Sequence, residues 1–480
     1  MADPLTPWQN SLTNLNLCVM KNTITYISLI IFMLINVILQ AQKKTEVLTR
    51  SDKKEAIEKT GELLKKFYVN PVLGSLMENH LKSKHKEGAF KNISDPGEFV
   101  RSITEEMRSI SNDKHLFMYV GPNPDKQERG DRNLKSLVNQ LDREKDNYGL
   151  NRIEIIDGNI GYMNIESVMY SEEAGEVLSS ALKFLSNTYA IIFDLRNNSR
   201  GGDPMYMAYL FSYFFEKPTH INSIYWRDRD RTDEFWTQEK IQGKKMIDIP
   251  LFVLISHKTF SGAEEFAYDL QSLSRATTIG EVSAGGANPA STWLVYEDLR
   301  ISIPYGRAIN PITGTNWEGV GVIPDIEVSA EKALEIAMKN AKTAAEKYYT
   351  TKKNILISHY DKCASDLGKA DKLFMVGKIE EAEKTVVSSI LKAIDNDVYN
   401  QTSINQLAYD YLNQDNKLMA IALFKANVEA YPGAVDVYDS LGEAYLENGN
   451  EQLAINNYKK ALEIDPNYAT ALRALEKINK

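Results

Sequence analysis

Cysteine and histidine are both scarce in this sequence. Of 480 residues, two are cysteine and six are histidine. Cys18 lies in an N-terminal segment with the pattern of a signal peptide, so a processed chain keeps only Cys363 and forms no intrachain disulfide. No group of cysteines and histidines has the spacing of a zinc site. The sequence therefore predicts no metal, no other cofactor and no fold held by disulfides.

The chain also lacks a long basic run. Its formal net charge is −9 at pH 7, whereas nucleic-acid-binding surfaces are usually clusters of positive charge. We therefore expect no nucleic-acid partner.

The N-terminal apolar run is short for a membrane-spanning helix. It covers Ile24 to Leu39, or 16 positions, whereas a span needs about 20. With Lys21 before it and Ala41 after it, residues 1–42 have the pattern of a signal peptide cleaved after Ala41. We therefore expect export, to the periplasm or outside the cell.

An uncleaved membrane anchor stays open as an alternative for residues 1–42, because Leu39 is not the small residue that signal peptidases prefer. Met20 followed by Lys21 would make a normal signal-peptide start. Residues 1–19 are therefore open to interpretation as a mis-called start.

The composition is that of a globular protein, with 43% apolar and 25% charged residues, which excludes wholesale disorder. Residues 43–112 have helical apolar spacing and predict an N-terminal helical cap. Residues 113–330 alternate strand-like and helical runs, which predicts an α/β core; strand is expected over 294–303 and 320–326. Residues 331–362 predict a charged helical connector.

Residues 363–480 contain a repeat with a period of 34. Two sets of residues match at this spacing: Leu407, Ala408, Tyr411, Ala420, Phe424 and Pro432, and then Leu441, Gly442, Tyr445, Ala454, Tyr458 and Pro466. The period resembles that of the tetratricopeptide repeat, an all-α module. A degenerate earlier copy is expected at about 363–396. Such repeats bind proteins on a concave face, although packing on the core or self-association stays open.

Four segments carry candidate chemistry, and each has a plainer interpretation. Ser261 follows the apolar run 251–256 and precedes a helical run at 264–273, where it could attack a carbonyl or simply cap the helix. Gly201 and Gly202 could offer amides to a ligand or form a tight turn. His115 could be a base or a structural histidine. Glu318 could orient an imidazole or be a solvated loop charge.

Taken together, these segments resemble the tail-specific, or carboxyl-terminal processing, S41 family of serine peptidases, within the branch of the tricorn core and interphotoreceptor retinoid-binding protein. The resemblance implies a crotonase-like ββα spiral core, as in ClpP. The four segments are Asp113-Lys-His115, Asp194-Leu-Arg-Asn-Asn-Ser-Arg-Gly-Gly202, Thr259-Phe-Ser-Gly-Ala-Glu264 and Trp317-Glu-Gly-Val-Gly-Val-Ile-Pro-Asp325, and a fifth, shorter element is Ile279-Gly-Glu281.

The resemblance implies a triad in which Ser261 is the nucleophile, His115 the base and Glu318 the group that orients the imidazole. The oxyanion would be bound by the amide of Gly262 and by one from Gly202 or Gly201, with Gly202 preferred. One family branch uses a serine–lysine dyad instead. Gly286 stands where that lysine is expected, which argues against a dyad here.

Four further expectations concern neighbouring residues. Lys114 replaces the small residue usual before the histidine, and its ammonium is expected to point to water. His257 is a second, weaker candidate for the base. Asp194 and Arg196 are expected to pair with each other or with backbone near the glycine turn. Glu264 and Glu265 fit the favourable charge of a helix start and are given no catalytic role.

The segment between His115 and Gly161 has about 45 residues, too few for a PDZ domain.

The resemblance and the N-terminal pattern together favour an exported serine endopeptidase that acts on protein or peptide. The alternatives are an inactive carrier of apolar ligands or peptides on the same fold, and a scaffold that acts through its repeats.

Overall fold

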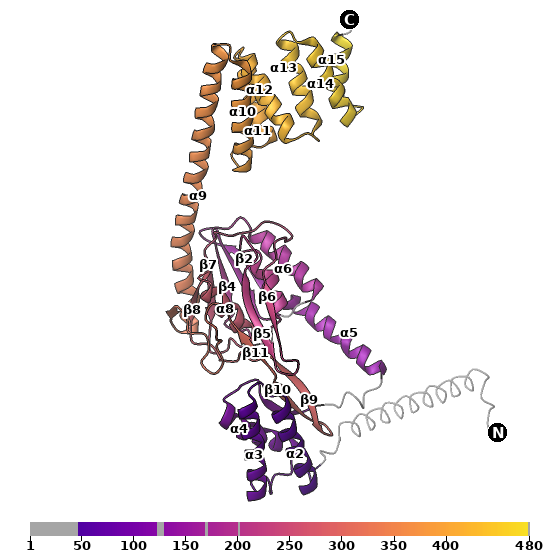
Figure 1. Ribbon diagram of the computed structural model, residues 1–480, viewed down its shortest axis with the longest axis vertical. Coiled ribbons are helices and arrows are strands. Elements are labelled where there is room, and N and C mark those ends of the chain that lie inside the picture. Colours follow the sequence, from indigo (N-terminus) through magenta and orange to yellow (C-terminus); the bar gives the residue numbers. More distant parts are fainter. Residues whose placement is uncertain (1–46, 122–128, 169–170, 200–201, 479–480) are drawn as a thin grey trace, which may run out of the picture. The chain divides into compact units, whose positions relative to one another are not determined.

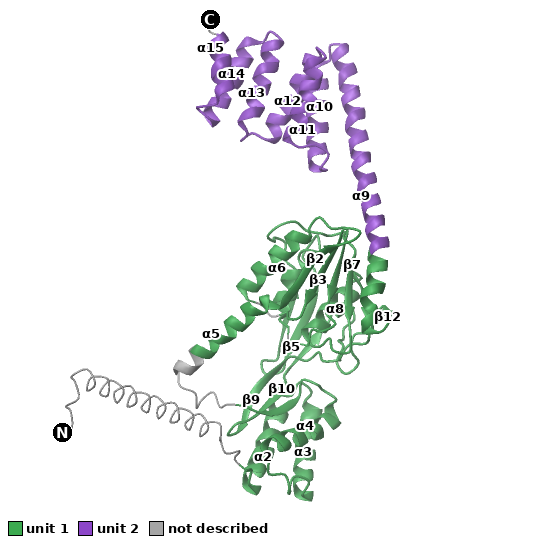
Figure 2. Cartoon of the chain, turned by 180° about the vertical axis from the view of Figure 1, so that it is seen from behind, with its two compact units in different colours: residues 1–341 green, residues 342–480 purple. Residues whose placement is uncertain are grey.

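The computed structural model describes residues 47–121, 129–168, 171–199 and 202–478. The predicted signal peptide or anchor and Gly201 lie outside these residues. Across the described ranges, every helix is too short or too polar to cross a bilayer. The chain divides into two compact units, residues 1–341 and 342–480 (Figure 2).

From residue 47 on, where the described part of the chain begins, three helices come first: α2 (Arg50–Phe67), α3 (Pro71–Glu87) and α4 (Pro96–Ser111). Each begins at a polar residue whose side chain accepts a backbone N–H of the first turn, and α3 and α4 carry proline at the first position, which suits a helix start. The helical cap predicted for this region thus consists of three helices.

Helices α2 and α4 pack against a small antiparallel sheet, and α3 packs against α2 and α4 (Figure 1). Its strand order is β1 (Phe117–Val120), β10 (Leu299–Pro304) and β9 (Ala290–Tyr296). Strand was expected over 294–303, and the structure has it as the two strands of a hairpin, because the chain turns at Glu297, which has a positive φ of 43°.

The central sheet has six strands, in the order β12 (Ile326–Glu327), β8 (Ala276–Gly280), β7 (Leu251–Ile255), β4 (Ala190–Asp194), β3 (Ile160–Ile165) and β2 (Leu150–Ile156). All pairs are parallel except β3 with β2. Every residue of β4 and β7 is buried, as expected for apolar runs covered on both faces. The α/β core predicted from the sequence is confirmed.

The remaining elements of the core surround this sheet. A second antiparallel sheet has the order β11 (Gly306–Ile309), β5 (His220–Trp226) and β6 (Arg231–Trp236). The helices are α5 (Arg129–Lys145), α6 (Glu172–Leu185), α7 (Pro204–Phe211) and α8 (Gly262–Ser272), with the short 3-10 helix η2 at Asn147–Gly149.

The strand expected over 320–326 is mostly absent. Only β12 forms there, at Ile326 and Glu327. Gly319 and Gly321 have positive φ angles of 73° and 77°, which turn the chain away from an extended course. The amide of Val322 donates to Ser283 Oγ at 2.6 Å instead of to a neighbouring strand.

The parallel pairing of β4 with β7 brings two of the predicted motifs to the same edge of the sheet. The loop after β4 leads to Gly202, and the loop after β7 leads to Ser261. Hydrogen bonds join the two loops, from Phe260 N to Asn198 O at 3.0 Å and from Thr259 Oγ1 to Leu195 O at 2.9 Å. Carboxyl ends of parallel strands are the usual place for ligands in such sheets.

The second unit is helical. The long helix α9 (Ala330–Met375) runs through the boundary between the units and through the predicted boundary at 362. It is followed by α10 (Ile379–Asp395), α11 (Gln401–Asn413), α12 (Lys417–Ala430), α13 (Val435–Glu447), α14 (Glu451–Ile464) and α15 (Ala469–Ile478). The two 34-residue copies correspond to α11 with α12 and α13 with α14, which confirms the helical repeats.

Candidate active site

Ser261 lies at the N-cap of α8, in a strained conformation. Its backbone has φ 60° and ψ −122°, a region that costs a residue with a side chain about 1–3 kcal/mol and is found mostly at functional sites. Its Oγ lies 3.0 Å from His115 Nε2. The structure thus brings together two side chains that are 146 residues apart in the sequence.

His115 is held from several sides. Its backbone N–H donates to Asp113 Oδ1 at 3.0 Å, and its ring stacks on Phe260 with 4.5 Å between centroids. The Arg108 guanidinium donates to the carbonyls of Lys114 and Leu116, on either side of His115. Burial, with a smaller contribution from Arg108, lowers the pKa of His115 to about 4. The imidazole is therefore neutral at pH 7 and free to accept a proton.

Glu318 lies beside the imidazole, in a loop after β11. Its Oε2 accepts from the amides of Ala287 and Asn288, at 2.6 and 3.1 Å. Glu318 Oε1 and His115 Nδ1 are both buried, and neither has a hydrogen-bond partner among the described residues. Burial, and then the charge of Asp113, raise the pKa of Glu318 to about 7. Glu318 and His115 are neighbours here without the hydrogen bond that would fix the tautomer.

Asp113 belongs to the histidine motif, but sequence reasoning gave it no role. It is 1% exposed and also accepts hydrogen bonds from Tyr68 Oη at 3.2 Å and Asn288 Nδ2 at 3.3 Å. Burial raises its pKa. One polar atom from each of Asp113, His115 and Glu318 lies within 4.8 Å of the other two. An imidazole with two carboxylates is also a set of metal ligands, so the absence of a metal stays a prediction.

Gly202 and Gly262 are in direct backbone contact. A Cβ placed on Gly262 would lie 2.7 Å from Gly202 N, and one placed on Gly202 would overlap Gly262 Cα. Neither of these two amides donates a hydrogen bond to another described residue. The two glycines are therefore adjacent, and Gly262 directly follows Ser261. Gly201, the third predicted donor, lies outside the described residues.

The space beside the imidazole is narrow at position 286. A Cβ on Gly286 would lie 2.9 Å from His115 Cε1 and 2.8 Å from Phe260 Cζ. A side chain at this position would crowd the two rings where they lie here. The assignment of a histidine, and not a lysine, as the base stays a prediction.

Three neighbouring residues can now be placed. Lys114 is exposed, as expected, and its Nζ donates to Ala284 O at 2.5 Å at the surface. His257 is exposed and pairs with Glu281, Nδ1 to Oε2 at 2.7 Å, so it is not the partner of Ser261 here. Arg196 makes two hydrogen bonds to the carboxylate of Asp194, at 2.6 and 2.9 Å, as the sequence predicted.

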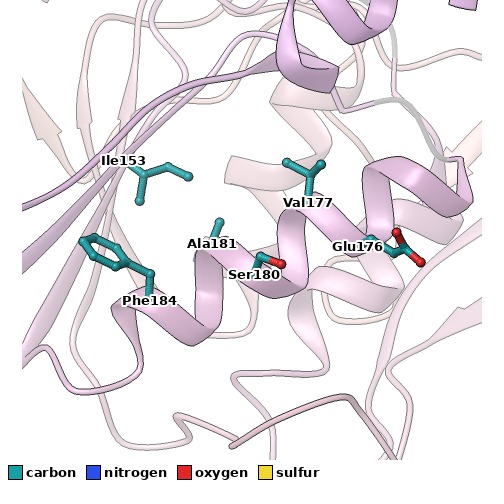
Figure 3. A pocket seen from close by; sticks show the side chains of 6 residues that line it. All are labelled: Ile153, Glu176, Val177, Ser180, Ala181 and Phe184. Carbon is teal, nitrogen blue, oxygen red and sulfur yellow. The ribbon is translucent and has the colours of Figure 1, made fainter.

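An open surface pocket of about 530 Å³ lies elsewhere on the core (Figure 3). Its apolar lining comes from Ile153 of β2 and from Val177, Ala181 and Phe184 of α6, and Glu176 and Ser180 add polar atoms. None of these residues belongs to the cluster around Ser261.

Comparison with known families matches three parts of the chain. Peptidase family S41 matches residues 159–328. The N-terminal domain of this peptidase in eukaryotic IRBP, the interphotoreceptor retinoid-binding protein, matches residues 40–150. A TPR, or tetratricopeptide, repeat matches residues 442–476.

One curated protein and two solved structures illustrate the likeness. The tetratricopeptide repeat domain-containing protein PYG7, chloroplastic, of Arabidopsis thaliana is 27% identical over 112 residues, 23% of this chain and 37% of that protein. A lipoprotein from Streptococcus agalactiae is 15% identical, with a TM-score of 0.41, over 61% of this chain and 97% of that one. The photosystem II D1 C-terminal processing protease is 13% identical, with a TM-score of 0.39, over 59% and 94%.

The three family matches follow one another along the chain in the order of the helical cap, the α/β core and the helical repeats. The chain therefore belongs to peptidase family S41, with an N-terminal domain of the type in eukaryotic interphotoreceptor retinoid-binding protein and a C-terminal tetratricopeptide repeat region.

Proposed function

We propose that this protein is a serine endopeptidase that hydrolyses peptide bonds through an acyl-enzyme. The observation that carries the proposal is the distance of 3.0 Å between Ser261 Oγ and His115 Nε2, which is within hydrogen-bond reach for proton transfer. Membership in an S41 peptidase family supports peptide as the substrate class.

In the proposed mechanism, Ser261 Oγ attacks the carbonyl carbon of the substrate while His115 Nε2 takes its proton. The amides of Gly262 and Gly202 bind the oxyanion, and each such donor contributes about 10²–10³ in rate. His115 then gives the proton to the leaving amine. A water molecule next attacks the carbonyl carbon of the acyl-enzyme while His115 takes its proton, and His115 returns that proton to Ser261 Oγ.

Glu318 completes the proposed triad. The imidazole becomes a cation when it takes the serine proton, and a carboxylate at Nδ1 stabilises that cation. Glu318 Oε1 and His115 Nδ1 both lack another described partner, so the proposed hydrogen bond between them requires an adjustment of the two side chains. Substrate binding could supply that adjustment, since catalytic hydrogen bonds often tighten only in the complex.

A fluorophosphonate probe, which reacts with activated serines, tests this proposal. We expect the wild-type protein to be labelled, and the Ser261→Ala and His115→Ala variants to remain unlabelled. His257→Ala is the matched control, because His257 is a nearby histidine that pairs with Glu281 instead. Labelling of Ser261→Ala, or equal labelling of His115→Ala and wild type, would contradict the triad.

The second candidate is an inactive carrier of apolar ligands or peptides on the same fold. The missing hydrogen bond between His115 Nδ1 and Glu318 favours it. A well-folded wild-type protein that the probe does not label and that leaves casein intact would select this alternative.

We further propose that the protein is exported and that its repeats bind another protein. The N-terminal pattern of residues 1–42 supports export, and the match to a tetratricopeptide repeat supports a protein partner. Fractionation of cells that express the full chain tests the first point. Pull-down with residues 342–480, the compact second unit, tests the second.

A further inference from the structure

Glu264 is a buried carboxylate one turn after Ser261. Its exposed fraction is 0%, and four donors surround it. Its Oε2 accepts from Ser261 N at 2.8 Å and Gly286 N at 2.9 Å. Its Oε1 accepts from Ser283 Oγ and Gly285 N, both at 2.5 Å. A carboxylate without such partners would be costly to bury, so this set of contacts specifies an acid at position 264.

The loop that binds Glu264 also binds Glu318. The amides of residues 285 and 286 donate to Glu264, and the next two amides, of Ala287 and Asn288, donate to Glu318 Oε2. Consecutive amides that point to one side commonly form anion sites. One short loop thus connects a carboxylate on the nucleophile's helix to the predicted acid of the triad.

The same loop packs against the imidazole. A Cβ on Gly286 would lie 2.9 Å from His115 Cε1, and the Gly286 carbonyl accepts from Trp317 Nε1 at 2.9 Å. Trp317 directly precedes Glu318 and is 2% exposed. A displacement of this loop would therefore move the surroundings of His115 and Glu318 together.

We propose that Glu264 is a positioning residue for the site: it ties the backbone of Ser261 to the loop 285–288, which in turn holds Glu318 and encloses His115. This inference rests on the proposed serine peptidase function. It assigns to Glu264 more than a favourable charge at a helix start, because its partners are the nucleophile's own amide and the loop of the triad acid.

The substitution Glu264→Gln would remove part of the hydrogen-bond acceptor capacity of this side chain without changing its size. Glutamine keeps the size of glutamate but has one oxygen and one NH₂ group, and an NH₂ group cannot accept from an N–H. Whichever way the amide is turned, two of the four donors lose their acceptor. The loop 285–288 would then loosen, and water would reach the imidazole.

The experiment compares Glu264→Gln with Glu265→Gln. Glu265 is the matched control, because it is buried in the same helical turn and accepts from Asn222 Nδ2 at 2.9 Å, outside the loop. Two readouts are followed: the rate of fluorophosphonate labelling, and the NMR titration of the His115 Cε1 proton, assigned with His115→Gln. Circular dichroism monitors the fold.

For Glu264→Gln we expect labelling to slow by about 100-fold, since misplacement of catalytic groups by about 1 Å has this effect. We also expect the pKa of His115 to rise toward its ordinary value, because burial is the main cause that lowers it. Glu265→Gln should match wild type in both. Equal behaviour of the two variants in both readouts would overturn the proposal.

The titration separates this inference from the proposed function. If wild type is not labelled but His115 titrates at a higher pH only in Glu264→Gln, the peptidase proposal fails and the positioning role stands. If Glu264→Gln does not fold, Ser283→Ala removes one of the four donors and should shift both readouts in the same direction by less. Unchanged labelling and titration in Ser283→Ala would then refute the role.

Discussion

The contact between Gly202 and Gly262 makes a quantitative prediction about the oxyanion donors. In Gly202→Ala, the new methyl group would overlap Gly262 Cα and lie 3.1 Å from Val168 Cγ2. We expect the loss of function in this variant to come from this crowding.

The size of the effect follows from the displacement that alanine requires. Ordinary contacts of a Cβ atom begin at 3.4 Å, so the two backbones must separate by about 1 Å. A shift of this size moves one amide out of hydrogen-bond range of the oxyanion. Loss of one donor costs about 10²–10³ in rate, or roughly 2.7–4 kcal/mol of transition-state stabilisation.

The assay is the second-order rate constant for fluorophosphonate labelling of wild type, Gly202→Ala and Gly175→Ala. Gly175 is the matched control, because it lies in α6 and the nearest atom to its added Cβ is 4.0 Å away. We expect a fall of about 10²–10³ for Gly202→Ala and no change for Gly175→Ala. A folded Gly202→Ala protein that labels at the wild-type rate would refute the assignment of the oxyanion donors.

Three further predictions concern the triad and the repeats. Labelling of wild type should rise with pH through about 7, where Glu318 loses its proton. The Glu318→Gln variant should be labelled more slowly than wild type, and the midpoint of its pH dependence should lie near the pKa of His115, about 4. A midpoint equal to that of wild type in a pH series would count against this. Gly286→Lys should abolish labelling, because its Cβ would lie 2.9 Å from His115 Cε1; a labelled variant would restore the dyad alternative. Gly442→Leu should destabilise the repeats by about 1–3 kcal/mol through overpacking, whereas Gly368→Leu, which meets open space, should not; thermal unfolding followed by circular dichroism compares them.

Several features of the fold could be predicted because they are written in local patterns. The apolar runs of β4 and β7 are continuous and wholly buried, and the helices that follow begin at recognisable caps. The hairpin of β9 and β10 was missed, because one apolar stretch conceals a turn at Glu297. The strand expected over 320–326 was also wrong, since two glycines with positive φ redirect the chain there.

The candidate site could be predicted in part. The identities of Ser261, His115 and Glu318 come from motifs that can be read in the sequence. Glu264 was interpreted as an acid that suits a helix start, although its four hydrogen-bond donors lie as far away in the sequence as Gly286. Asp113 lies inside a motif, but its contacts with Tyr68 and Asn288 join distant segments. No local pattern signals such contacts.

The sequence by itself determined that the protein has an α/β core and helical repeats of 34 residues, because periodicity is a property of short segments. The motifs that resemble the S41 family predicted a serine, a histidine and a glutamate as the candidate reactive groups. Only the tertiary structure decided that Ser261 Oγ lies 3.0 Å from His115 Nε2, that Gly202 touches Gly262, and that one loop holds two carboxylates. Those distances depend on how strands far apart in the chain pair and pack, and sequence spacing does not measure them.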